Sequence, residues 1–168
     1  MPSSYTITDD KILTPEEVKQ FYYKYEITEG MQKTCGEMIF EIAEKKGLTS
    51  EKKAGYGIDV KTISELTGLN ERIIYLLKNP DCRLTKAHVV SFAIGLGINT
   101  TGTRILLDIN GMVFNPSSTV DQAYTELLEN HQGKSIADCN AILRDLGIDE
   151  KHFLGSYERG EYTLKSKE

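Results

Sequence analysis

The sequence predicts an all-α protein, and three observations carry that prediction. Amphipathic runs with helical spacing recur along the chain, and each follows a residue that caps helices. Most of these runs end at a glycine, a residue that often terminates a helix. The chain has 168 residues, of which 39% are hydrophobic and 27% charged, which is the composition of an ordinary globular domain.

The sequence also limits where the protein works. No stretch approaches about eighteen uninterrupted apolar residues, which excludes a membrane span. The N-terminus has neither a basic start nor an apolar run, which excludes a secretory signal. Cys35, Cys82 and Cys139 are odd in number and far apart, which suits reduced thiols better than disulfides. We therefore expect a cytoplasmic protein that does not bind a membrane.

The first two helices are predicted from how they begin. The run Thr14-Pro15-Glu16-Glu17 combines a capping threonine, a proline at the first helical position and acids in the first turn. A second helix is predicted from Thr34 to Lys46, because its apolar residues share one face and Gly47 follows it. Residues 48–58 are expected to form a connection.

Residues 59–78 carry the most specific pattern. Asp59 can cap a helix whose apolar residues recur at spacings of three until Gly68 stops it, namely Val60, Ile63 and Leu66. Asn70 can cap the next helix, over 71–78. Two short helices joined through Gly-Leu-Asn are typical of a helix-turn-helix, because glycine tolerates the left-handed turn and Leu69 fills the angle between the helices. Ser64 is the small residue that a close helix crossing requires.

Further capping residues predict the helices that follow. Thr85 begins a helix that Gly97 ends and that we expect in the core, and Thr101 or Thr103 begins another that ends before Asn110-Gly111. Ser118 with Asp121, and Ser135 with Asp138, have capping-box spacing ahead of two more helices, the second ended by Gly147. Residues 149–168 are charged and punctuated by glycine, and we expect a short hairpin or a frayed tail.

Two runs carry a family resemblance: Leu66-Thr67-Gly68-Leu69-Asn70 through Ile74, and Ala93-Ile94-Gly95-Leu96-Gly97-Ile98-Asn99. They resemble the Cro-type, lambda-repressor-like helix-turn-helix class, also called the Xre family. The Asn79-Pro80-Asp81 segment with its flanks, and Asn115-Pro116-Ser117-Ser118, look like a group of that class common in Firmicutes. The resemblance covers roughly residues 34–148.

The resemblance implies an all-α, lambda-repressor-like bundle in four parts. An N-terminal extension with one helix (1–33) precedes the helix-turn-helix domain (34–111), and a C-terminal helical segment (112–148) and a tail (149–168) follow. Residues of about 60–68 would support a recognition helix at about 70–79, which lies in the major groove of DNA. Carried over by position, the residues facing base edges are Asn70, Glu71, Arg72, Tyr75 and Leu76, and those holding the DNA backbone are Lys61, Lys78, Arg83 and Lys86.

These positions suggest specific DNA contacts. Arg72 could grip a guanine edge with two hydrogen bonds, Glu71 could accept one from cytosine, and Asn70 could cap the helix or touch a phosphate. The chain as a whole is acidic, with a formal net charge of −5, but residues 61–100 hold five basic and three acidic groups. A module this weakly basic would need to bind as a homodimer. The first hypothesis is therefore a sequence-specific DNA-binding transcriptional regulator that uses no cofactor.

The recognition helix departs from the family because it offers the apolar residues Ile73, Tyr75 and Leu76. Such residues can touch a thymine methyl but supply little hydrogen-bond discrimination. Ile73 and Leu76 could instead pack against the N-terminal extension or the second helical segment, since an exposed apolar patch normally marks an interface. The alternative hypothesis is a protein-interaction adaptor or antitoxin-like partner on a degenerate helix-turn-helix scaffold.

An enzyme is not expected from these residues. The three histidines, His88, His131 and His152, have no metal-ligand spacing, and the chain has no CxxC pair. Cys139 has no histidine near it in the sequence, and Gly95-x-Gly97 lacks the third glycine of a dinucleotide loop. We therefore predict no metal, no cofactor and no catalytic residues.

Overall fold

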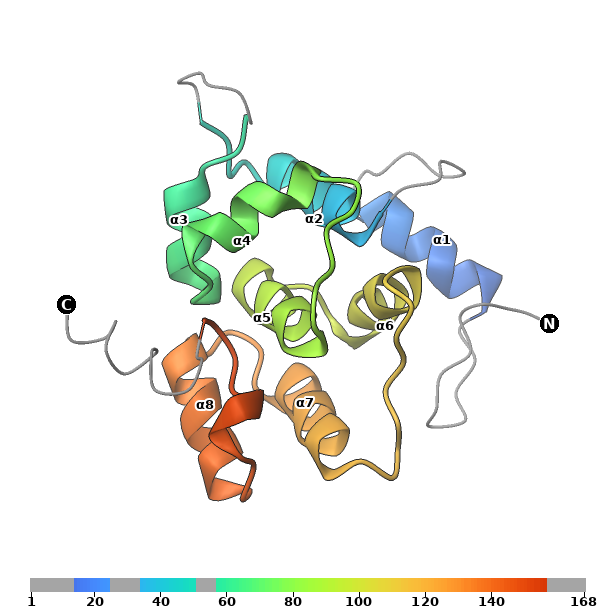
Figure 1. Cartoon of the computed structure of the whole chain (residues 1–168). Coiled ribbons are helices and arrows are strands. Elements are labelled where there is room, and N and C mark those ends of the chain that lie inside the picture. The colour runs from blue at the N-terminus through green and yellow to red at the C-terminus, as the bar shows by residue number, and fades with distance from the viewer. Residues whose placement is uncertain (1–13, 25–33, 51–56, 157–168) are drawn as a thin grey trace.

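A computed structural model describes residues 14–24, 34–50 and 57–156, and this part of the chain is helical without strands, which confirms the predicted all-α class. In chain order the elements are α1 (Pro15–Lys24), α2 (Cys35–Lys45), α3 (Val60–Thr67), α4 (Glu71–Tyr75), the 3-10 helix η1 (Leu76–Lys78), α5 (Lys86–Leu96), α6 (Thr100–Ile109), α7 (Thr119–Asn130), α8 (Ile136–Asp145) and the 3-10 helix η2 (Glu150–His152) (Figure 1). None of these helices is long and apolar enough to cross a membrane.

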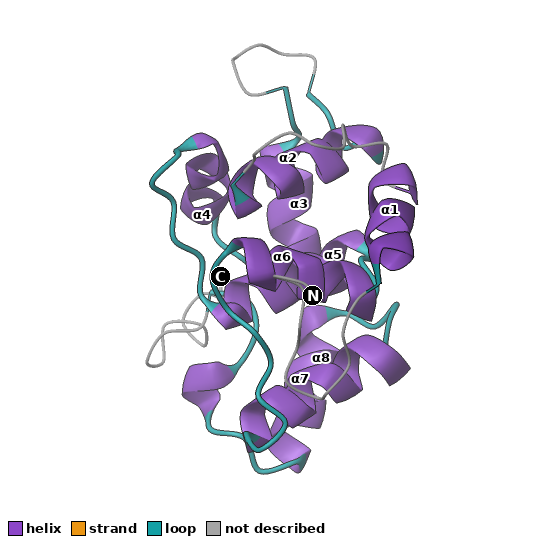
Figure 2. Ribbon diagram, turned by 90° about the vertical axis from the view of Figure 1, so that its right-hand side faces the viewer, coloured by secondary structure: helices purple, strands orange, loops and turns teal. Residues whose placement is uncertain are grey.

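Helix α5 forms the centre of the molecule, as the sequence predicts. Seven of its eleven residues are buried, and it packs against α3, α6, α7 and α8. Helices α2, α3 and α4 lie on one side of α5, and α7 and α8 lie on the other (Figures 1 and 2). A helix that is apolar nearly all round must be enclosed in this way to bury its surface.

Helix α1 belongs to the same core, with Phe21 as its buried side chain and Val18 and Tyr22 packed against the core beside it. Phe21 is buried, and α1 packs against α6. A Cβ atom built on Gly102 of α6 would lie only 2.9 Å from the Phe21 ring, so the ring fits because Gly102 has no side chain. The predicted N-terminal helix is therefore an integral part of the bundle.

Most predicted helix starts are confirmed by a side chain that accepts a backbone N–H in the first turn. This holds for Thr34, Asp59, Asn70, Thr85, Ser118 and Ser135. The predicted start of α6 at Thr101 or Thr103 is wrong. Asn99 caps that helix by accepting the Gly102 N–H at 2.9 Å, whereas the Thr103 hydroxyl donates to the Asn99 carbonyl from inside the first turn.

Two other local predictions need correction. Leu66 was expected on the apolar face of its helix, but it is 42% exposed, and Thr67 is buried instead. The Thr67 hydroxyl donates a hydrogen bond to the Ile63 carbonyl at 2.8 Å, and this bond makes the burial of Thr67 possible. The helix expected over 71–78 is α-helical only to Tyr75, and its last turn narrows to the 3-10 form of η1.

The prediction of a hairpin or frayed tail is wrong for residues 149–156. Asp149 caps η2, and the following Phe153 and Leu154 are buried. Their apolar side chains provide the reason, because burying them outweighs the polar character of their neighbours. Residues 157–168, the rest of the predicted tail, lie outside the described part of the chain.

Candidate nucleic-acid interface

A short turn over Gly68, Leu69 and Asn70 joins α3 to α4, where the sequence predicts a turn. Gly68 ends α3 in the left-handed conformation, with φ of 74°, which a side chain would disfavour. Leu69 is 1% exposed and fills the angle between the helices. The Ser64 hydroxyl donates to the Leu69 carbonyl at 2.6 Å, and the Thr67 hydroxyl accepts the Leu69 N–H at 3.3 Å. The turn is therefore held both by side-chain hydrogen bonds and by the buried Leu69 side chain.

The close crossing assigned to Ser64 is made by a glycine on the facing helix. A Cβ atom built on Gly95 of α5 would lie 2.7 Å from the Leu66 carbonyl oxygen and 2.7 Å from the Thr67 Cγ2 atom. Helix α3 therefore rests on α5 backbone to backbone. Ser64 itself is only partly buried and serves the turn.

Helix α4 and the following η1 are held at their far end in a similar way. Ile74 and Leu77 are buried and face the core. The N-terminal turn of α2 lies directly against η1, because a Cβ atom built on Gly36 would be 2.5 Å from the Leu77 carbonyl oxygen. Helix α4 and η1 are thus braced by α3 at one end and by α2 at the other.

The opposite face of α4 and η1 is exposed to solvent. Glu71 and Arg72 are exposed, and Tyr75 and Leu76 are 46% and 38% exposed. Ile73 differs, because it is half-buried and packs against the core. The sequence suggests that Ile73 and Leu76 could both pack inward. The structure partly buries Ile73 but leaves Leu76 exposed.

Asn70 acts as the helix cap. Its Oδ1 atom accepts the Ile73 N–H at 3.3 Å, which satisfies one of the free donors of the first turn. Its own backbone N–H donates to the Ser156 hydroxyl oxygen. Only the side-chain amide nitrogen of Asn70 would then be left for a phosphate.

The basic residues predicted to hold a DNA backbone fall into two groups. Lys61, Lys78 and Arg83 are exposed on and around α3, α4 and η1, and the Lys78 ammonium lies 5.0 Å from the centre of the Phe40 ring. Lys86 is already engaged, because its Nζ atom lies 2.8 Å from Asp121 Oδ2 and donates to the Val113 carbonyl at 2.9 Å. Lys86 therefore ties α5 to α7 and to the segment before it.

Acidic residues balance the basic ones on this surface. Residues 59–83 contain Lys61, Arg72, Lys78 and Arg83, and also Asp59, Glu65, Glu71 and Asp81. Asp59 is used locally, since hydrogen bonds from the Thr62 side chain and backbone lower the pKa of its carboxyl group. Residues 59–83 therefore carry no net formal charge, so DNA binding would depend on where each cation lies.

Sequence reasoning missed the groups that support this site from a distance. Ile136 at the start of α8 touches Gly68, since a Cβ atom there would lie 3.1 Å from Ile136 Cγ2. Ser156 donates its N–H to the Gly68 carbonyl at 2.9 Å. These partners are separated from the turn by at least 68 positions, so no local motif announces them.

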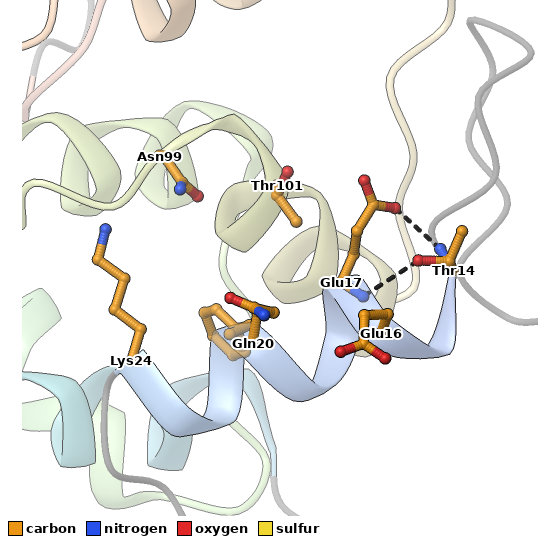
Figure 3. A pocket seen from close by; sticks show the side chains of 8 residues that line it. Thr14, Glu16, Glu17, Gln20, Lys24, Asn99 and Thr101 are labelled. Carbon is orange, nitrogen blue, oxygen red and sulfur yellow. Dashed lines mark hydrogen bonds between the residues drawn. The ribbon is translucent and has the colours of Figure 1, made fainter.

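Elsewhere the described part of the molecule offers less. A depression of about 510 Å³ lies between α1 and the start of α6 (Figure 3), where Thr14 and Glu17 form a reciprocal capping pair at 2.9 and 3.1 Å. No group of three or more His, Cys, Asp and Glu side chains could hold a metal ion among the residues described. Burial raises the pKa of Cys35 to about 12 and that of Cys139 to about 11, which makes both thiols poor nucleophiles.

Comparison with known proteins adds no assignment to these observations. No family model, no curated protein and no solved structure matches this chain.

Proposed function

We propose that this chain is a sequence-specific DNA-binding transcriptional regulator that places α4 in the major groove of double-stranded DNA. One observation carries the proposal. The inner face of the α4–η1 rod is buried through Ile74 and Leu77, while its outer face presents Glu71 and Arg72 to solvent. A rod that is rigidly braced on one side and polar on the other has the form of a recognition helix.

The exposed side chains suggest a division of roles. Arg72 would read guanine through two hydrogen bonds, and Tyr75 and Leu76 would contact a thymine methyl group. Lys61 and Arg83 lie outside the helix and would hold phosphates, which fixes the register of α4 without reading sequence. Lys86 takes no part in this scheme because Asp121 already neutralises it.

The balance of charge bears on the oligomeric state. With few cations available, one module would neutralise few phosphates, and affinity that rests on phosphate contacts would be low at physiological salt. We therefore propose a homodimer on a two-fold site, whose half-sites would lie one helical turn of DNA apart, about 34–36 Å. Analytical ultracentrifugation of the free protein and of its DNA complex tests this part separately.

The function is tested by selecting binding sites from random duplex DNA with the purified full chain. The selected sequence is then titrated by fluorescence anisotropy across salt concentrations. We expect a defined motif whose affinity falls as salt rises. Failure to enrich any sequence, together with no binding at low salt, would overturn the proposal.

Variants separate base reading from phosphate holding. Arg72→Ala should cost about 1–3 kcal/mol and relax the sequence preference at one position. Lys61→Ala should weaken binding to all sequences alike and reduce the salt slope by about one. Lys19→Ala is the matched control, because Lys19 is exposed on α1, a helix that packs against α6.

A second candidate function rests on the exposed apolar pair Tyr75 and Leu76. An adaptor that binds another protein through this face would use the same two side chains as contacts, since apolar surface favours a protein interface. Leu76→Asp would then abolish binding to that partner, whereas Arg72→Ala and Lys78→Ala would leave it unchanged. The opposite pattern, with DNA affinity lost in the arginine and lysine variants, favours DNA.

A further inference from the structure

Residues 149–156, which we call the C-terminal strap, are anchored along their length to α7 and α8. The Tyr124 hydroxyl donates to the His152 carbonyl at 2.6 Å. The Asn140 side chain accepts the Leu154 N–H at 2.8 Å and donates to the Leu154 carbonyl at 3.1 Å. Both Asn140 and Leu154 are buried, so these bonds are shielded from water.

The end of the strap lies on the helix-turn-helix. Gly155 donates its N–H to the Ser91 hydroxyl of α5 at 2.9 Å. Ser156 donates its N–H to the Gly68 carbonyl at 2.9 Å, and its hydroxyl oxygen accepts the Asn70 N–H. The two Ser156 bonds therefore lie on either side of Leu69, the residue that sets the angle between α3 and α4.

Gly155 makes this approach possible. Its φ is +84°, and a Cβ atom on it would lie 2.9 Å from the Gly68 carbonyl oxygen. Any side chain at this position would meet both a strained backbone and a fixed backbone atom. The strap reaches the turn only because its backbone and that of Gly68 touch without side chains between them.

Helix α4 depends on such support at its start. It has only five α-helical residues, and short helices gain little stability from their own hydrogen bonds. Its buried side chain Ile74 lies in its second half, and the buried Leu77 follows in η1, so both hold that end. The first turn, which carries Glu71 and Arg72, is held by the Asn70 cap and by Ser156.

We infer that the C-terminal strap orients the first turn of the recognition helix, with Ser156 as a positioning residue for DNA binding. This inference deepens the proposed function and rests on it for the DNA part alone. The orientation of α4 in the free protein is a separate physical property and can be measured without DNA. The chain's α7–α8 half would thus contribute to recognition through the strap, without contacting a base.

The test compares the full chain with Ser156→Ala, Ser156→Thr and Gly155→Ala. Ser118→Ala is the matched control, because it also removes one hydroxyl that accepts an N–H at a helix start, that of Asp121 in α7. Amide hydrogen exchange by NMR reports on the Asn70 N–H, and fluorescence anisotropy reports on the affinity for the selected DNA.

In Ser156→Ala we expect exchange at Asn70 to be about fivefold faster and DNA binding about fivefold weaker, the loss of one hydrogen bond. Ser156→Thr should restore both, and Gly155→Ala should exceed Ser156→Ala in both. Ser118→Ala should change neither.

Unchanged exchange at Asn70 in Ser156→Ala would overturn the inference, as would an equal effect of Ser118→Ala. Faster exchange with unchanged DNA affinity would overturn the positioning role, since the strap would then only stabilise the turn. If the unmodified chain binds no DNA, the proposed function fails and the positioning role for DNA fails with it, while the exchange data still decide whether the strap orients α4.

Discussion

Replacing Gly36 by alanine tests how tightly η1 is braced by α2. A Cβ atom at this position would lie 2.5 Å from the Leu77 carbonyl oxygen and 3.2 Å from the Leu77 Cα atom. Carbon and oxygen atoms normally stay beyond about 3.3 Å. Either η1 or the N-terminal turn of α2 must therefore move by ~0.8 Å, and both are backbone, so no side-chain rotation relieves the contact.

The magnitude follows from two opposing effects. Overpacking of this kind typically costs about 1–3 kcal/mol. Alanine is a better helix former than glycine by up to about 1 kcal/mol, which offsets part of the cost. We expect Gly36→Ala to lower the free energy of unfolding by ~1–2 kcal/mol, which corresponds to a Tm about 3–6 °C lower for a chain of this size.

Thermal unfolding followed by circular dichroism measures the effect. Glu44→Ala, at an exposed position of the same helix, is the control and should stay within about 0.5 kcal/mol of the parent protein. Under the proposed function, Gly36→Ala should also weaken DNA binding, because Leu77 lies in η1, which continues the helix that would carry the reading face. A Tm equal to or above that of the parent would refute the reasoning, because it would mean that helix propensity outweighs a contact described here as rigid.

Three further predictions concern the supports of the fold. Asp121→Ala leaves Lys86 and the Asn115 N–H without their carboxylate partner, and should lower the free energy of unfolding in urea by about 1–3 kcal/mol. This cost is less than for a fully buried ion pair, because the Lys86 side chain is 25% exposed. A change below about 0.5 kcal/mol would contradict the prediction. Asn140→Ala removes both hydrogen bonds to Leu154 and should lower the free energy of unfolding by about 1–3 kcal/mol. It should also speed amide exchange at Gly155. Slow exchange there would show that Asn140 does not hold the strap. Folding raises the pKa values of Cys35 and Cys139 from 9.0 to about 12 and about 11, so the unfolded chain releases these protons first. The free energy of unfolding should therefore fall above about pH 9, by up to ~1.4 kcal/mol per pH unit for each thiol. The double variant Cys35→Ala with Cys139→Ala should flatten this slope, and an unchanged slope would count against the prediction.

Local signals in the sequence predict most of the helix starts correctly. Thr34, Asp59 and Ser135 cap their helices as expected, because a capping bond joins residues only three positions apart. The start of α6 was misplaced because three adjacent residues, Asn99, Thr100 and Thr101, can all accept such a bond. In the structure Asn99 is the residue that makes this bond, by accepting the Gly102 N–H.

The supports of the candidate site could not be predicted, because they join distant parts of the chain. Ser156 and Asn70 are 86 positions apart, and Lys86 and Asp121 are 35 apart. In the sequence Gly36 and Gly95 look like ordinary helical glycines. Their close backbone contacts are evident only once the facing element is in place. Local reasoning therefore placed the α3–α4 turn correctly and missed what fixes it in space.

The contact between Gly68 and Gly155 also has a consequence for evolution. Each residue occupies a left-handed conformation, and each leaves the room that the other needs. A side chain at either position would push the two backbones apart. If the chain between Phe153 and Ser156 then detaches, the other position no longer needs a glycine. In diverging descendants of this gene we expect the two codons to be kept or lost together, so an alignment deep enough to measure their covariation would reveal this long-range contact without any structure.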